Sequence, residues 1–282
     1  MDAVVAMLRY VAPQAQPLHT YAYDPPDGSP RFNGTLVEHA MSVHDARGLD
    51  HGTEFHGPGF TLTEHRTDVV HFDSDREVID IGYPEAEMLV RRVTGAPHAR
   101  VFDHTLRRRA THRPPLDGLG GSFAAIREPV GRVHADYTPI SAPMRLKHVL
   151  EEETAERVMR DRYMIVGLWR PLLRDPLQDA PLALVDARSV CRDDLVFNDI
   201  VYPDRRGQTY AVRHNAAHQW YYFSGQTREE VTVFVHYDSA RAHDAVTGAC
   251  PHTAFEHPLT PAGAAPRQSI ELRALAWYED CA

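Results

Sequence analysis

The sequence has 282 residues, of which 43% are hydrophobic and 24% charged, the composition of an ordinary globular protein. Its 30 basic and 39 acidic residues leave a net charge of −9, and no long run of Lys or Arg occurs, so nucleic acid and anionic membranes are not expected partners. No apolar stretch approaches the roughly 18 residues of a membrane helix, and the N-terminal segment carries Asp2 and Arg9, so we expect a cytoplasmic protein without a membrane segment. The cysteines Cys191, Cys250 and Cys281 form no CxxC pair and predict neither a disulfide framework nor a zinc site.

The first part of the chain, residues 1–110, mixes short extended pieces with one predicted helix at 84–94. Pro84 in the first turn, Glu85 near the positive end and Gly95 as the stop are the usual signals of such a helix. We interpret this part as a support region for the remainder of the chain.

Strand candidates dominate the rest of the chain. They lie at 122–135, 162–169, 181–190, 208–223, 230–238, 251–255 and 268–278, and one predicted helix at 146–160 interrupts them. Successive strands without alternating helices favour a sandwich or barrel over a parallel α/β sheet. The predicted fold is therefore mainly β: a single domain over 1–282, with a double-stranded β-helix (a jelly-roll, cupin-like core) at 111–282 and flanking α-helices.

A His-x-Asp pattern is the sharpest local feature. On a strand, His134 and Asp136 point to the same face, about 6 to 7 Å apart along the backbone. One imidazole and one carboxylate, completed by a second His from a distant strand, form the two-His, one-carboxylate triad that holds non-haem Fe(II). The alternative interpretation is a surface His and Asp on a half-exposed strand.

The order of residues near the C-terminus supports the metal interpretation. In jelly-roll iron oxygenases the second His lies on the penultimate strand, and an Arg on the last strand binds the distal carboxylate of 2-oxoglutarate. Here His252 is followed by Arg267 and Ser269 in that order. A guanidinium binds a carboxylate bidentately, and the hydroxyl adds one hydrogen bond.

At these residues the sequence resembles the CmcJ/NvfI-like Fe(II)/2-oxoglutarate oxygenases. The resemblance covers roughly residues 55–279 and rests on blocks that stand in the expected order: 94–96, 103–107, Val-His-Ala-Asp-Tyr-Thr (133–138), Trp-Arg-Pro (169–171), 181–189, 218–223, 237–239, Pro-His-Thr-Ala-Phe (251–255) and 267–273. Members of this family often have Asn two residues before Trp-Arg-Pro, where this chain has Gly167. If that position lines the pocket, the substrate differs from those of better-known relatives.

The choice of the second histidine rests on counting strands. Several histidines lie downstream of Asp136: His214, His218, His236, His243, His252 and His257. The count places 231–238 on the strand before His252 and His252 on the penultimate strand, ahead of 267–278, which favours His252. His218 and His214 are the alternatives, because their spacing from Asp136 is nearer to that of compact oxygenases.

Two further arginines enter the prediction of the cofactor site. Arg273 shares a strand face with Arg267, so it competes as the carboxylate anchor; Ser269 favours Arg267. Arg170 ends an apolar strand, where an unpaired guanidinium is costly to bury. It therefore either meets an acidic partner or holds a carboxylate ligand, and we count it as a candidate cofactor-binding residue.

The resemblance implies an enzyme, a dioxygenase that uses Fe(II), 2-oxoglutarate and molecular oxygen. Its expected reaction is the oxidation of an unactivated C–H bond, by hydroxylation, desaturation or oxidative cyclisation, in the biosynthesis of natural products. The expected partner is a small specialised-metabolite or amino-acid-derived substrate, and the sequence indicates no oligomeric state. The alternatives are a cupin-like isomerase or hydrolase that binds a metal without 2-oxoglutarate, and a non-catalytic jelly-roll binding protein.

Overall fold

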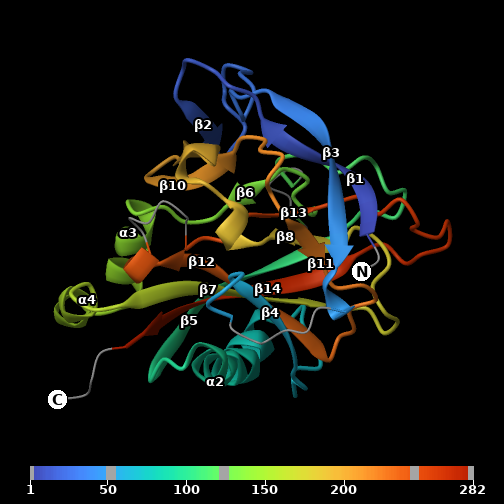
Figure 1. Ribbon diagram of the computed structural model, residues 1–282. Coiled ribbons are helices and arrows are strands. Elements are labelled where there is room, and N and C mark those ends of the chain that lie inside the picture. Colours follow the sequence, from blue (N-terminus) through green and yellow to red (C-terminus); the bar gives the residue numbers. More distant parts are fainter. Residues whose placement is uncertain (1–2, 49–54, 121–126, 242–247, 279–282) are drawn as a thin grey trace.

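The computed structural model describes residues 3–48, 55–120, 127–241 and 248–278, and it contains two β-sheets that face one another (Figure 1). The larger sheet has nine strands in the order β1 (Ala3–Val11), β3 (Leu36–Asp45), β11 (Trp220–Tyr222), β8 (Leu182–Val185), β13 (His252–Ala254), β6 (His134–Ala135), β10 (Arg206–Val212), β9 (Leu195–Val201) and β2 (Leu18–Tyr21). The smaller sheet has five strands in the order β4 (Phe60–Glu64), β12 (Glu230–Asp238), β7 (Tyr163–Pro171), β14 (Gln268–Trp277) and β5 (His98–Arg108).

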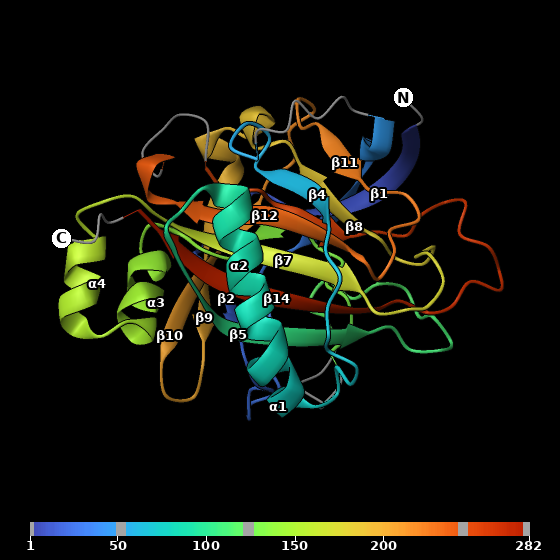
Figure 2. The same cartoon turned by 90° about the horizontal axis from the view of Figure 1, so that it is seen from below.

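Helices cover the smaller sheet and one end of the molecule. Figure 2 shows α2 (Tyr83–Thr94) lying across the outer face of the five-stranded sheet. A short α1 (Asp75–Glu77) and a π-helical turn at Val78–Gly82 precede α2, and Gly95 ends it in the left-handed conformation with φ of 72°. The helices α3 (Ser141–Val149) and α4 (Glu152–Val158) lie together at one end of the sheets.

Strand β7 connects the two parts of the core, because all nine of its residues are buried. On one face, Val166 and Leu168 pack with apolar side chains of α2. On the other face, Trp169 packs with Leu182 and Leu184 of the larger sheet. The alternation along β7 therefore separates an outer face under α2 from an inner face between the sheets.

The predicted mainly β architecture with flanking helices is confirmed, and several details differ. The single helix predicted at 146–160 is two helices, because the chain is extended at Leu150 and Glu151. The strand predicted at 208–223 is divided between β10 and β11, and β9 was not predicted. Of the strand predicted at 122–135, the described part contains only the two residues of β6, and 122–126 lies outside the described residues.

The N-terminal region was predicted to be a support layer, but it supplies strands to both sheets. β1, β2 and β3 belong to the larger sheet, and β4 and β5 belong to the smaller one. β3 pairs in parallel with β11, which lies about 180 residues later in the sequence. The first 110 residues are therefore integral to the sheets. Within the described part of the chain, no helix is long and apolar enough to cross a membrane.

Candidate metal centre

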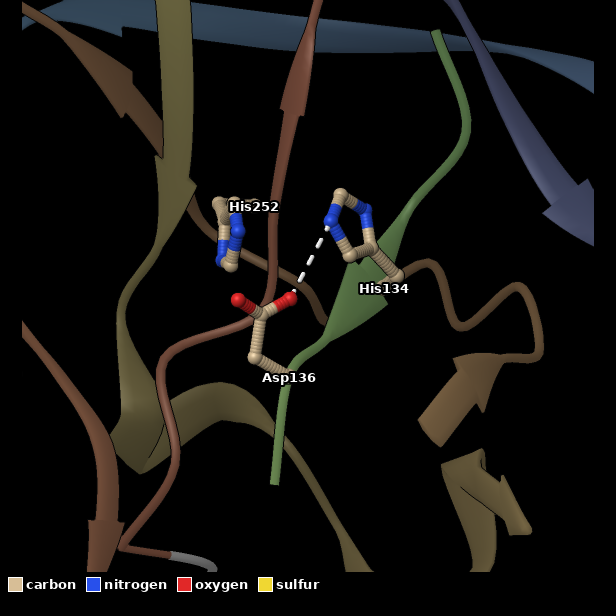
Figure 3. A group of neighbouring side chains, drawn as sticks. All are labelled: His134, Asp136 and His252. Carbon is tan, nitrogen blue, oxygen red and sulfur yellow. Dashed lines mark ion pairs between the residues drawn. The ribbon is translucent and has the colours of Figure 1, made fainter. Parts of the chain in front are cut away.

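The pairing of β13 with β6 brings the predicted triad together. His252 is directly opposite His134, and their ring centroids are 4.4 Å apart. Asp136 comes directly after β6 and points toward the two rings (Figure 3). One ligand atom of each of the three residues lies within 4.8 Å of the others. The alternation predicted from His-x-Asp therefore places both side chains on the inner face.

Backbone carbonyls orient the two imidazoles. The Nδ1 atom of His134 lies 2.8 Å from the Arg132 carbonyl, and the Nδ1 atom of His252 lies 3.1 Å from the Cys250 carbonyl. Because a carbonyl only accepts, each Nδ1 donates its proton and each Nε2 keeps a free lone pair. This is the usual arrangement of metal-binding histidines, in which one ring nitrogen is fixed by an acceptor.

Burial sets the protonation of the three side chains. Burial lowers the pKa of His134 to about 3 and also lowers the pKa of His252. Burial alone raises the pKa of the Asp136 carboxyl, but its neighbours His236 and Arg273 outweigh this effect and hold the pKa well below its usual range. At neutral pH the group therefore offers two neutral imidazoles and one carboxylate, the form in which these side chains bind a metal. This donor set fits Fe(II).

Arg273 fixes the orientation of the Asp136 carboxylate. Its Nη1 donates to Asp136 Oδ2 at 3.1 Å, and its Nε donates to Asp103 Oδ1 at 2.7 Å. The other oxygen, Asp136 Oδ1, lies 3.5 Å from His134 Nε2. Since His134 is neutral, this contact is not an ion pair. Asp136 Oδ1 is therefore directed toward the same region as the Nε2 lone pairs of His134 and His252.

A second buried pair adjoins the triad. His236 Nε2 lies 3.0 Å from Glu271 Oε1, and the hydrogen bond from His236 overcomes burial to lower the pKa of Glu271 to about 2. His236 Nδ1 lies 3.9 Å from Asp136 Oδ2, and it has no hydrogen-bond partner among the described residues. Sequence reasoning did not assign a role to this pair. The signal available was parity, because Glu271 shares the inner face of β14 with Ser269 and Arg273.

Arg267 and Ser269 lie together on the inner face of β14. The Arg267 side chain is buried; its Nε donates to Ser269 Oγ at 3.0 Å and its Nη1 to the Ala180 carbonyl at 2.9 Å. Its guanidinium lies 4.9 Å from the centre of the Trp169 ring. Among the described residues its guanidinium contacts no carboxylate, and burial lowers the pKa of Arg267 to about 9. A buried guanidinium with neutral partners suits an anionic ligand.

Arg170, predicted as a cofactor-binding residue, is not brought to this group. It lies next to Trp169 on β7, so its side chain points to the opposite, outer face of the sheet. There it lines a small cavity with Leu168 and residues of α2. The pattern Trp-Arg-Pro thus contributes Trp169, and not Arg170, to the surroundings of Arg267.

The alternative histidines lie elsewhere. His218 is buried between Tyr10 and Asp194, with ring nitrogens 3.2 Å from Tyr10 Oη and 3.1 Å from Asp194 Oδ2. His214 is exposed, and its ring is stacked on His39 with centroids 3.8 Å apart. Of the histidines weighed as the second ligand, His252 is the one that joins His134 and Asp136 within the described chain, whereas His236 joins Asp136 and Glu271 in an adjoining group that could also hold a metal.

Gly167 provides space for the second buried pair. A Cβ atom at this position would lie 2.6 Å from His236 Nε2 and 2.7 Å from the Phe234 ring. We expect Gly167→Ala to displace His236 from Glu271 and to lower the free energy of unfolding by about 1–3 kcal/mol, as overpacking of a core does. Urea denaturation measures the loss. Gly263→Ala is the control, because a Cβ there meets nothing within 4 Å; equal stability of both variants would contradict the prediction.

Asp179 supports the position of Arg267. Its Oδ1 pairs with Arg109 Nη1 at 2.6 Å, and its Oδ2 accepts the backbone N–H of Arg267 at 3.0 Å. The Asp179 side chain is 2% exposed, and its removal leaves Arg109 with the more exposed carboxylate of Glu256 at 2.9 Å and leaves the Arg267 N–H without its acceptor. We therefore expect Asp179→Ala to cost about 1–3 kcal/mol in urea denaturation. The exposed pair of Asp204 with Arg205 is the matched control, and Asp204→Ala changes stability by about 0.5 kcal/mol or less. A loss below about 1 kcal/mol for Asp179→Ala would contradict this role.

Two facing sheets with a buried group of two histidines and one carboxylate are the features of a jelly-roll, metal-dependent oxygenase. A family model described as "Oxidoreductase/YMDC permease-like domain" matches residues 8–277. The chain is 30% identical to the Fe(II)/2-oxoglutarate-dependent dioxygenase nvfI of Aspergillus novofumigatus, over 91% of this chain and 90% of that protein. It is 31% identical to the hydroxylase/desaturase efuI of Hormonema carpetanum, over 84% of this chain and 83% of that protein.

Solved structures agree with these matches. The iron and α-ketoglutarate-dependent endoperoxidase NvfI superposes with a TM-score of 0.83 and 28% sequence identity, covering 99% of both chains. The chain therefore belongs to this oxidoreductase family, among the NvfI-like Fe(II)/2-oxoglutarate-dependent dioxygenases. The predicted family and jelly-roll fold are confirmed, and the protein is an enzyme whose cofactor and co-substrates are Fe(II), 2-oxoglutarate and molecular oxygen. A binding protein without activity and a cupin-like isomerase or hydrolase are not supported.

Proposed function

We propose that this dioxygenase holds Fe(II) on His134, Asp136 and His252, anchors 2-oxoglutarate on Arg267 and Ser269, and oxidises an unactivated C–H bond of a small molecule. The observation that carries the proposal is the burial of an unprotonated His-Asp-His group on the same inner surface as a guanidinium without a carboxylate partner. The metal ligands and the anchor for 2-oxoglutarate then both lie between the two sheets.

The side chains of the protein have separate tasks in this reaction. When bound, Fe(II) would supply the redox chemistry by which oxygen oxidises both the small-molecule substrate, giving the oxidised product, and 2-oxoglutarate, giving succinate and carbon dioxide. Arg267 binds the distal carboxylate of 2-oxoglutarate, and Ser269, already within 3.0 Å of Arg267 Nε, keeps that guanidinium in place. Arg273 holds one oxygen of Asp136, so the carboxylate presents its other oxygen to the metal.

The substrate is proposed to be a specialised metabolite or an amino-acid-derived compound. Relatives of this chain carry the names hydroxylase/desaturase efuI, aspirochlorine biosynthesis protein N and endoperoxidase NvfI, which supports an oxidation in specialised metabolism whose outcome varies within the family. Hydroxylation, desaturation and oxidative cyclisation share the first step, removal of hydrogen from carbon. The outcome then depends on how the substrate is positioned, to better than about 1 Å.

We also propose a single-domain, cytoplasmic enzyme without a nucleic-acid partner. Both sheets combine strands from before residue 110 with strands from the remainder of the chain, which supports one domain. The free thiols of Cys191 and Cys250 suit a reducing compartment. The net charge of −9 opposes binding to a phosphate backbone.

Oxygen uptake tests the proposed function. Anaerobically purified protein is loaded with Fe(II), and oxygen consumption and succinate are measured with and without 2-oxoglutarate. We expect slow, stoichiometric formation of succinate that requires 2-oxoglutarate and disappears in His134→Ala and Asp136→Ala, while Asp204→Ala retains it. Oxygen uptake that does not depend on 2-oxoglutarate, or activity that survives both ligand substitutions, would refute the proposed site.

A further inference from the structure

A groove rich in arginine lies on the outer face of the five-stranded sheet. It has a volume of about 510 Å³ and is lined by Arg66, Thr67, Arg170, Arg174, Arg228 and Glu229. Because Arg170 points away from the inner face of β7, this groove is separated from the metal centre by the sheet itself. Four cations and one anion line it, although the whole chain has 39 acidic and only 30 basic residues.

Arg170 forms the buried end of this groove. The residue is only 6% exposed, and its guanidinium has two neutral partners: Nη2 lies 2.7 Å from His65 Nδ1, and Nη1 donates to the Arg228 carbonyl at 3.3 Å. Glu85 is close enough to line the same small cavity, but its carboxylate accepts from the Thr67 hydroxyl and from the Asp68 backbone N–H at 2.8 Å. The charges of Glu85 and Glu229 act on Arg170 from nearby, but among the described residues no carboxylate makes a hydrogen bond or ion pair with its guanidinium.

The other three arginines are equally without a carboxylate. Arg66 and Arg174 are exposed, and neither makes a hydrogen bond or ion pair within the described chain. Arg228 donates to the Val69 carbonyl at 3.1 Å and lies over the Phe72 ring at 5.2 Å, which holds its guanidinium beside Arg170. A buried charge without a direct carboxylate partner is costly, so a fold that keeps one beside three more cations is suited to an anion.

We propose that this groove binds a phosphate group, either free or as part of a small organic molecule, at a site distinct from the metal centre. Guanidinium groups bind phosphate oxygens through two parallel hydrogen bonds, and several of them match the two negative charges of phosphate at neutral pH. The cavity behind Arg170 holds only about 20 Å³, room for a single water molecule, so the anion lies in the open groove. Glu229 at the rim disfavours anions that do not reach Arg170.

Isothermal titration calorimetry on the full-length protein tests this site. Inorganic phosphate and the monoester phenyl phosphate are titrated separately, with chloride at equal ionic strength as the reference. We expect saturable phosphate binding to the wild type and a loss of affinity of about tenfold or more in Arg66→Gln/Arg174→Gln, two exposed positions where folding is unaffected. If phenyl phosphate binds more tightly than inorganic phosphate, the natural ligand of the groove is a phosphorylated organic molecule. If it binds equally or more weakly, the natural ligand is free phosphate.

A matched variant excludes a general charge effect. Arg157→Gln/Arg205→Gln removes the same two charges from α4 and from the β9–β10 turn, and we expect it to bind phosphate as the wild type does. His134→Ala is expected to retain phosphate binding as well, which separates this site from the metal centre. No binding beyond that of chloride, equal losses in both double variants, or binding of a polyglutamate peptide without binding of phosphate would overturn the proposal.

Discussion

His252→Ala is expected to lower the affinity for Fe(II) by about 100-fold or more, since it removes one of three protein ligands. In the wild type, the hydrogen bond from His252 Nδ1 to the Cys250 carbonyl directs the Nε2 lone pair toward the metal site. The alanine side chain has no atom that could bind the metal in its place. His252 is buried and packs against the Phe234 ring at 4.9 Å. The measurement is anaerobic competition for Fe(II) against a chromogenic chelator.

His218→Ala is the matched control, because the sequence offered His218 as the alternative ligand. Its imidazole bridges Tyr10 and Asp194, so its removal leaves two buried polar groups without this partner. We expect a loss of about 1–3 kcal/mol in stability and an unchanged affinity for Fe(II). Equal Fe(II) affinities of His252→Ala and the wild type, or a selective loss in His218→Ala, would contradict the assignment of His252.

Arg267→Gln is expected to weaken 2-oxoglutarate binding by about 30- to 1,000-fold, which corresponds to losing about 2–4 kcal/mol from a buried charge pair. Arg267 is 3% exposed and its guanidinium is hydrogen-bonded to Ser269, so the position of the guanidinium is fixed before the ligand arrives. Glutamine is polar, but it has neither the positive charge nor the two parallel N–H donors with which a guanidinium binds a carboxylate bidentately. Titration of 2-oxoglutarate into the Fe(II)-loaded protein under anaerobic conditions measures the effect.

Arg273→Gln and Arg170→Gln distinguish the three arginines. Arg273 donates to Asp103 and Asp136, so its substitution should weaken the metal site and leave the direct contact with 2-oxoglutarate intact. Arg170 lies on the outer face of β7, and its substitution should change neither the metal nor the 2-oxoglutarate affinity. A larger effect on 2-oxoglutarate binding from either variant than from Arg267→Gln would contradict the assignment of Arg267.

Local patterns in the sequence predicted the pairing of His134 with Asp136 and much of the sheet. Alternation along a strand places His134 and Asp136 on one face whatever the rest of the fold does. The choice of His252 needed a count of strands together with the strand order of jelly-roll iron oxygenases. Strands β7, β12 and β14 could be predicted because they are continuous runs of apolar or alternating residues. The strands themselves, unlike the choice of His252, follow from the alternation of apolar and polar residues along the sequence.

The remainder of the site depends on which strands pair and in what register. His236 and Glu271 lie on β12 and β14, which are separated by β7, so their contact at 3.0 Å follows from the sheet order and from the missing side chain of Gly167. The sequence also left undecided on which side of the sheet Arg170 lies. Alternation places Arg170 and Trp169 on opposite sides of the strand, but it does not say which of these two residues points between the sheets. β9 was missed because its residues are mostly half-buried and its pattern is mixed.

The most direct test of the central claim is an anaerobic titration of the metal-free protein with Fe(II) and then with 2-oxoglutarate, followed by visible absorption. If His134, Asp136 and His252 hold the metal beside Arg267, a weak charge-transfer band appears only after both additions. That band survives His218→Ala and disappears in His252→Ala, and Arg267→Gln shifts its appearance to much higher 2-oxoglutarate concentrations. An intact protein that binds Fe(II) and develops no band with 2-oxoglutarate, or a band that persists in His252→Ala, would contradict the account.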